Sequence, residues 1–230
     1  AYNQNKVLKI NTPDSQETPS LEGYPVGAIF ALKTDGIDSE TGRIRVKAKN
    51  GKSMFLEDLY KVAIDEWGIG IYTPQVSTLE EREFYSYIGT SDAPYTGGFM
   101  NTFNYKFIDL SFNLSYSFGG YSYDNASYIL QDDGYSVISN KSTEQRRRWQ
   151  KPGDITDVPR FVYGNKKGGN YNSSRAIHST DHIRLKSLIL GLNAPKAWLQ
   201  KLGIGNARIY FSGTNLLTWA AYDQYDPEMS

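Results

Sequence analysis

Residues 108–118 (IDLSFNLSYSF) alternate large apolar and small polar side chains with a period of two, which predicts a β-strand. A soluble sandwich and a membrane barrel wall both produce this alternation. The length favours the wall, because a tilted strand needs about 9–11 residues to cross a bilayer and soluble strands peak near five or six. The large residues would then face lipid and the small ones a wet lumen. The two sets are Leu110, Phe112, Leu114, Tyr116 and Phe118, and Ser111, Asn113, Ser115 and Ser117.

Other segments are predicted to pair as antiparallel hairpins. An aromatic-rich strand at residues 95–105 connects to the alternating strand through Lys106-Phe107. A second pair covers residues 183–194 and 207–218, and an earlier pair covers residues 5–10 and 26–34. In the second pair a strict period of two places Leu188, Leu190 and Leu192 on one face with Arg184 and Lys186. The charged end of that strand is therefore expected to lie above the apolar band.

The connections differ strongly in length. Residues 36–91 and 119–180 are several times longer than an ordinary connection of about 4–6 residues, whereas residues 106–107 and 195–206 are short. Large external loops at one end and small periplasmic turns at the other are typical of outer-membrane barrels. We therefore expect the two short connections at one end of the sheet and the two long segments at the opposite end.

Composition excludes several classes of site. The 25 Lys and Arg balance the 25 Asp and Glu, so no nucleic acid is expected as a partner despite the run at residues 146–148. The absence of cysteine excludes disulfides, thiolate metal sites and cysteine nucleophiles. No apolar run approaches the ~20 residues of a membrane-spanning helix. Aromatic residues make up 14%, with 18 Tyr, which suits half-apolar, half-wet surfaces.

Few residues are candidates for a site. Three aromatic residues in a polar segment are substrate-contact candidates, because exposed aromatic rings stack on sugars or peptide side chains: Trp149, Tyr163 and Tyr171. The alternative is that they pack the segment against its neighbours. His178 and His182 have a metal-like spacing only on a helix, and a strand is expected there, so no metal site is predicted. Asp132, Asp133, Asp154 and Asp157 lack EF-hand spacing and are expected in a solvated loop. No catalytic or cofactor-binding residue is predicted.

Four stretches, in order, resemble the SusC/RagA family of TonB-linked outer-membrane proteins. Residues 22–38 (EGYPVGAIFALKTDGID) are similar to the family's Glu-Gly-x-Pro strand, and residues 93–120 to its Thr-Gly-Gly-Phe strand, turn and Asp-Leu-Ser strand. Residues 148–161 (RWQKPGDITDVPRF) look like its loop signature, and residues 183–228 are similar to its penultimate hairpin. These stretches cover most of the chain outside the variable loops.

The resemblance implies an all-β fold. Residues 1–230 would form the C-terminal part of a 22-stranded, plugged transmembrane antiparallel β-barrel with long extracellular loops. The plug, early strands and last strand of such a receptor are not expected within this chain, which would supply about six wall strands. We therefore expect these residues alone to form an open sheet that borders further polypeptide, because unpaired edges are costly in lipid.

The function implied is TonB-dependent uptake of a nutrient such as an oligosaccharide or peptide across the cell outer membrane, by a multi-pass protein. The implied partners are a SusD-like surface lipoprotein, the cargo, outer-membrane lipid, and TonB through a part of the parent protein outside this chain. Two other classes remain open from the residues: a soluble β-rich carbohydrate-binding module and a glycoside hydrolase. The hydrolase would need two converging carboxylates, and none stands out, so no enzymatic activity is expected.

Overall fold

The computed structural model describes residues 1–9, 22–64, 70–74, 83–135, 138–164, 173–201, 203–224 and 226–228. The strands are β1 (Ala28–Leu32), β2 (Thr34–Ile37), β3 (Ile44–Lys47), β4 (Ser53–Phe55), β5 (Tyr60–Ile64), β6 (Gly70–Pro74), β7 (Tyr85–Thr90), β8 (Tyr95–Tyr105), β9 (Ile108–Phe118), β10 (Tyr121–Tyr123), β11 (Ile177–Ser179), β12 (His182–Asn193) and β13 (Arg208–Ala220). The helices are α1 (Leu56–Leu59), η1 (Thr143–Arg147), η2 (Ser174–Ala176), α3 (Asn125–Leu130) and α4 (Lys196–Lys201). No helix among these described residues is long and apolar enough to cross a membrane.

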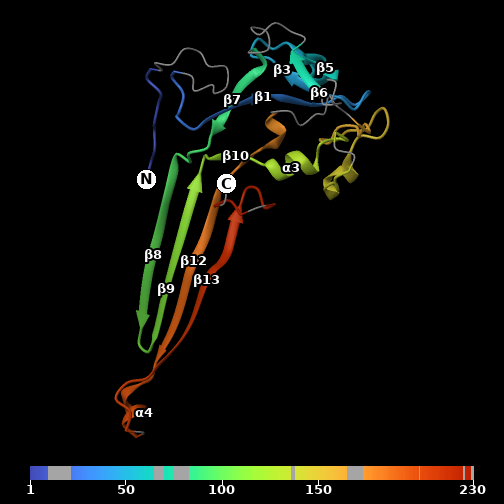
Figure 1. Ribbon diagram of the computed structural model, residues 1–230. Coiled ribbons are helices and arrows are strands. Elements are labelled where there is room, and N and C mark those ends of the chain that lie inside the picture. The colour runs from blue at the N-terminus through green and yellow to red at the C-terminus, as the bar shows by residue number, and fades with distance from the viewer. Residues whose placement is uncertain are drawn as a thin grey trace. The chain divides into compact units, whose positions relative to one another are not determined.

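The chain divides into two compact units. The sheet unit contains residues 1–6, 90–121 and 179–230, and the loop unit contains residues 7–89 and 122–178. The sheet unit is built on a four-stranded antiparallel sheet in the order β13-β12-β9-β8. Figure 1 shows these four strands as long, nearly aligned ribbons. Strands β8 and β9 have 11 residues each, β12 has 12 and β13 has 13, and these lengths match the predicted bilayer-crossing strands.

The short connections lie at one end of this sheet. Lys106 and Phe107 join β8 to β9 in a tight turn in which Lys106 adopts a φ of 53°, and Tyr105 pairs with Ile108 beside it. Residues 194–207, which contain α4, join β12 to β13 at the same end, because Leu192 pairs with Ile108. Both long segments leave from the opposite end, where Tyr95 pairs with Phe118. The predicted asymmetry of the connections is confirmed by this register.

A β-bulge in β12 corrects one sequence prediction. Leu185 pairs with Leu114 and Ser187 with Asn113, so one extra residue, Lys186, lies between two consecutive positions of β9. The extra residue reverses the alternation downstream. Arg184 consequently shares a face with Ser187, and the expected grouping of Arg184 with Leu188, Leu190 and Leu192 is wrong.

The earlier hairpin was also predicted wrongly. Residues 5–9 contain no strand, and position 10 lies outside the described residues. Val7 nonetheless exchanges backbone hydrogen bonds with the chain ahead of β1: its N–H donates to Tyr24 O and its O accepts from Gly23 N–H. The actual sheet partner of β1 is β7. Periodicity identifies a strand but not its partner, which explains this error.

The loop unit has a small apolar core of its own. Strands β2, β3 and β4 form an antiparallel sheet, with the Asn50-Gly51 turn between the last two and Gly51 at φ 86°. Its buried side chains come from β1, β3, α1, the residue after β3 and the residue before β7: Leu32, Ile44, Val46, Ala48, Leu56, Leu59 and Phe84. Burial of these residues holds this part of the loop unit together. Strands β5 and β6 pair as a separate hairpin.

Candidate functional site

One face of the four-stranded sheet is mostly apolar, with Asn101 of β8 as a polar residue within it. The register places large side chains from all four strands side by side on this face: Phe99, Phe103 and Tyr105 of β8, Leu110, Phe112 and Leu114 of β9, Ile183, Leu188 and Leu190 of β12, and Ile209, Phe211 and Trp219 of β13. The exposed fraction is 54% for Phe103, 62% for Phe211 and 77% for Ile209. None of the five predicted lipid-facing residues of β9 is buried. A patch of this extent needs an apolar environment.

The opposite face is lined mainly by hydroxyl and amide side chains. Its members are Thr96, Thr102 and Asn104 of β8, Ser111, Asn113, Ser115 and Ser117 of β9, Ser187 and Asn193 of β12, and Ser212, Thr214 and Thr218 of β13. The Thr102 and Ser111 hydroxyls form a cross-strand hydrogen bond of 2.8 Å. Small neutral groups of this kind suit a surface in contact with water or with polar protein. The four small polar residues predicted on this face of β9 share it with the polar residues of the other strands.

An ion pair crosses the polar face near the short connections. Asp109 of β9 binds Arg208 of β13 at 2.5 Å and accepts a hydrogen bond from Asn193 Nδ2 at 2.8 Å. Gly191 of β12 lies between them, and a Cβ added there would come within 2.5 Å of Asp109 Oδ1 and 2.6 Å of Arg208 Nη2. The missing side chain of Gly191 is therefore what allows the pair to bridge three strands.

A second charged network lies at the opposite end of β12. Arg184 donates to Glu228 at 3.1 Å and also binds Asp226, while Lys186 binds Glu228 at 2.5 Å. The hydrogen bond from Arg184 lowers the pKa of Asp226, and the hydrogen bond from Lys186 lowers that of Glu228. His182 lies beside this network, with Nε2 3.6 Å from Glu228 Oε1. Sequence patterns did not reveal this network, because its partners are more than forty residues apart.

In the loop unit, Trp149 anchors the segment 148–160. Its indole Nε1–H donates to Ser39 O at 2.7 Å, and its ring lies where a Cβ at Gly42 would be, 2.5 Å from Cδ2. Gly153 N–H also donates to Ser39 O, and Arg160 N–H donates to Gly42 O, both at 2.9 Å. Trp149 thus packs this segment onto residues 38–43, which leaves only part of its surface for a ligand.

The other two substrate-contact candidates have different outcomes. Tyr163 is 78% exposed, so its ring is accessible to a ligand. Tyr171 lies outside the described residues. The structure therefore does not bring the three candidates together as one described site.

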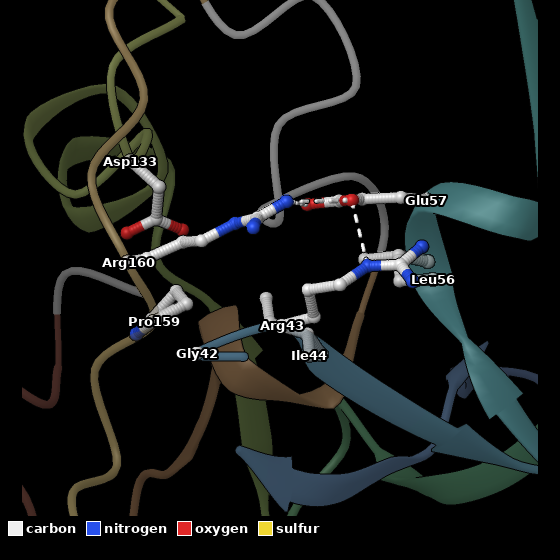
Figure 2. A pocket seen from close by; sticks show the side chains of 8 residues that line it. All are labelled: Gly42, Arg43, Ile44, Leu56, Glu57, Asp133, Pro159 and Arg160. Carbon is white, nitrogen blue, oxygen red and sulfur yellow. Dashed lines mark hydrogen bonds and ion pairs between the residues drawn. The ribbon is translucent and has the colours of Figure 1, made fainter. Parts of the chain in front are cut away.

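A narrow pocket in the loop unit is filled by charged side chains. Figure 2 shows Arg43 and Arg160 converging on Glu57, at N–O distances of 2.9 and 3.1 Å. The remaining wall residues are Gly42, Ile44, Leu56, Asp133 and Pro159. The pocket has room for about one water molecule, so it is too small for a sugar or a peptide.

Two aspartates expected in solvent are buried instead. Asp132 binds Lys141 at 2.5 Å, and Asp133, only 1% exposed, binds Arg175 at 2.6 Å and accepts from Gln145 Nε2 at 2.9 Å. Burial raises the pKa of Asp133, while Arg175 opposes this rise. Both aspartates are thus engaged in holding loop segments together, and the prediction that they are solvated is wrong.

Metal ligation has no structural support in the described part of the chain. No three His, Asp or Glu side chains gather there as a metal site. The His182 ring is buried, with Nδ1 2.9 Å from Thr180 O, and burial lowers the pKa of His178. Asp154 uses Oδ2 to accept the backbone N–H groups of Gln150 and Lys151, both at 3.0 Å.

Known proteins with similar sequence and structure identify the family. TonB-dependent receptor P3 of Formosa agariphila is 32% identical over 154 residues, which is 67% of this chain. TonB-dependent receptor P26 of the same organism is also 32% identical over 154 residues, or 62% of this chain. A structure of the RagAB peptide transporter matches 91% of the chain with a TM-score of 0.67 and 25% identity. This chain belongs to the SusC/RagA-type TonB-dependent receptors.

The matches also define the extent of the similarity. A RagAB peptide importer in its closed-closed state matches with a TM-score of 0.66 and 24% identity, which supports the fold. The chain spans 14–15% of the length of the two receptors and 21% of the two RagAB chains. No family model matches the chain. Within the family's all-β fold, the four long strands are barrel-wall strands, and the soluble sandwich is not favoured.

Proposed function

We propose that this chain is a C-terminal part of a barrel in the cell outer membrane, where a multi-pass receptor imports an oligosaccharide or peptide with energy delivered through TonB. The single observation that supports this most is the two-faced sheet of four long strands. Its apolar face fits lipid and its polar face fits a hydrated lumen. In this proposal the chain supplies wall strands and external loops, while TonB contacts a part of the parent protein outside it.

The relatives support a proposal for the cargo and for a lid. RagAB is named as a peptide importer, which favours peptides, while oligosaccharides remain the alternative cargo. The proposed lid is a SusD-like surface lipoprotein above the long segments. Tyr163 is the proposed cargo contact in the described loops because its ring is accessible, and Tyr171 remains a candidate from the sequence. We assign no catalytic step to the chain.

Uptake by cells tests the proposal directly. A strain lacking the full-length gene would be supplied with labelled oligopeptides and oligosaccharides, with and without a protonophore that removes the inner-membrane energy source. We expect uptake of one cargo class to be lost in the deletion strain, restored by the gene, and abolished by the protonophore. Equal uptake in all strains, or restoration that persists with the protonophore, would contradict TonB-dependent import.

A soluble binding module predicts a different behaviour of the protein. Such a module would stay monodisperse without detergent and would fractionate away from membranes. The full-length protein is instead expected in the outer-membrane fraction as a species whose electrophoretic mobility changes on heating.

A further inference from the structure

The end of the sheet with the short connections is cationic. Three lysines lie on its two connections: Lys106 in the β8–β9 turn and Lys196 and Lys201 at the two ends of α4. All three side chains are exposed. Residues 101–108 and 193–208 contain no Asp or Glu. The nearest carboxylate in sequence, Asp109, is already paired with Arg208, so the three lysine charges are left uncompensated by these connections.

Backbone hydrogen bonds hold the two connections together. Asn193 N–H donates to Phe107 O at 2.7 Å, which joins the β8–β9 turn to the start of the α4 connection. Ala194 N–H donates to Ala207 O at 2.9 Å and closes the base of that connection. Figure 1 shows α4 at the tip of the sheet, beyond β12 and β13. The three lysines therefore belong to one ordered surface.

Apolar side chains are exposed among these charges. Trp198 of α4 is 68% exposed, while its neighbour Leu199 is 6% exposed and tucked into the connection. Phe107 is 47% and Ile204 46% exposed. Lysines beside exposed tryptophan and aliphatic side chains are typical of protein surfaces in the headgroup layer of a membrane, where the ring meets the acyl boundary and the ammonium meets phosphate.

We propose that this surface, formed by Lys106, Lys196, Lys201 and Trp198, binds the headgroups of anionic glycerophospholipids. The inference rests on the proposed function, which puts the short connections at the periplasmic leaflet. Charge selects the occupant: three cations without a compensating carboxylate favour a lipid with net negative charge over a zwitterionic one. The lysine of the turn lies 5.3 Å from the Tyr105 ring centroid, which places its ammonium at the border of the apolar face.

Lipid selectivity of the purified full-length receptor tests this site. Nanodiscs would contain equal amounts of phosphatidylglycerol and phosphatidylcholine with the same acyl chains, and native mass spectrometry would count the lipids retained after release. The test variant is Lys106→Gln/Lys196→Gln/Lys201→Gln. The matched control is Lys47→Gln/Lys49→Gln/Lys52→Gln, which removes three exposed lysines from the β3–β4 hairpin of the loop unit.

We expect the wild type and the control to prefer phosphatidylglycerol. The test variant should lose about fivefold of that preference per lysine removed. Raising the salt to about 0.5 M should weaken the wild-type preference as well. A test variant that keeps the wild-type preference would overturn the proposal, and so would an equal loss in the control. Loss of a bound periplasmic protein without a change in lipid selectivity would show that the surface binds protein instead.

The two proposals can fail separately. If the receptor forms no heat-modifiable species in outer membranes, the proposed function fails and this inference fails with it. If that species forms and imports cargo, but wild-type receptor retains both lipids equally, only the lipid site is wrong.

Discussion

An arginine on the apolar face of β12 should destabilise the inserted receptor far more than one on the neighbouring position. Leu188 lies near the middle of β12, opposite Phe112 and Gly213, on the apolar face. Ile189 is the next residue, equally aliphatic, but it pairs with Ser111 and Ser212 on the polar face. Leu188→Arg and Ile189→Arg therefore both replace an aliphatic side chain with a charged one, on opposite faces of the same strand.

The expected magnitude follows from depth in the membrane. A strand tilted by about 45° advances roughly 2.3 Å per residue along the membrane normal, so the 12 residues of β12 span an apolar band of about 25 Å. Leu188 is then near the midplane, where arginine costs about 2–4 kcal/mol. This equals roughly a 30- to 900-fold loss in the folding equilibrium constant. Leu192 lies about 9 Å nearer the surface, so Leu192→Arg should cost about 0–1 kcal/mol.

Refolding of the full-length protein into liposomes gives the measurement. The fraction of heat-modifiable protein would be followed against urea concentration for the three variants and wild type. We expect the order of stability to be wild type, then Leu192→Arg and Ile189→Arg close together, and Leu188→Arg last. If Ile189→Arg is as damaging as Leu188→Arg, or more so, the assignment of faces downstream of the bulge is refuted.

Three further outcomes are expected. Gly191→Ala should displace the Asp109–Arg208 pair and lower the free energy of unfolding by about 1–3 kcal/mol. This loss should be smaller when Asp109 is already Asn, which a double-mutant cycle measured by urea unfolding would reveal. Because the pKa values of Asp226 and Glu228 are lowered, their stabilising contribution is complete above the ordinary values of 3.8 and 4.5 and is lost as pH falls through the lower folded values. The protection of residues 221–228 against hydrogen exchange, relative to an unfolded chain at the same pH, should therefore fall only in acid, and Arg184→Gln should lower it at neutral pH. Trp149→Ala should expose residues 148–160 to limited proteolysis, whereas Tyr163→Ala should leave proteolysis unchanged and weaken cargo binding by about tenfold; the opposite pattern would exchange their roles.

The sequence predicted the wall strands well because their signals are local. The alternation of residues 108–118 and the two short connections depend only on neighbours in the chain, and both are confirmed by the register. The face of Arg184 was predicted wrongly because a strict period of two was carried through Lys186. The apolar positions change there from odd (Ile183, Leu185) to even (Leu188, Leu190, Leu192), which is the sequence signal of the bulge.

Long-range pairing explains the other errors. Asp133 resembles any loop aspartate until Arg175, 42 residues away, is brought against it. Residues 26–34 resemble half of a hairpin, but β1 pairs with β7, and the described residues 5–9 contain no strand. For the substrate-contact candidates, aromatic identity alone does not separate a packed ring such as Trp149 from an accessible one such as Tyr163.

At the bulge of Lys186 the apolar face of β12 changes from odd-numbered to even-numbered residues, and neither neighbouring strand shows this change. On one side of the bulge the odd-numbered residues face the same way as Leu185, and on the other side the even-numbered residues do. Deleting that one lysine would remove the bulge and leave a regular alternation, because Leu185 and Ser187 already pair with the consecutive residues Leu114 and Asn113. Leu188, Leu190 and Leu192 would therefore keep their places on the apolar face, and Ser187 and Ile189 would keep theirs on the polar face. A one-residue deletion elsewhere in the strand would instead reverse the faces on one side of it, so alignments of this region must place the extra residue at Lys186 to assign faces correctly.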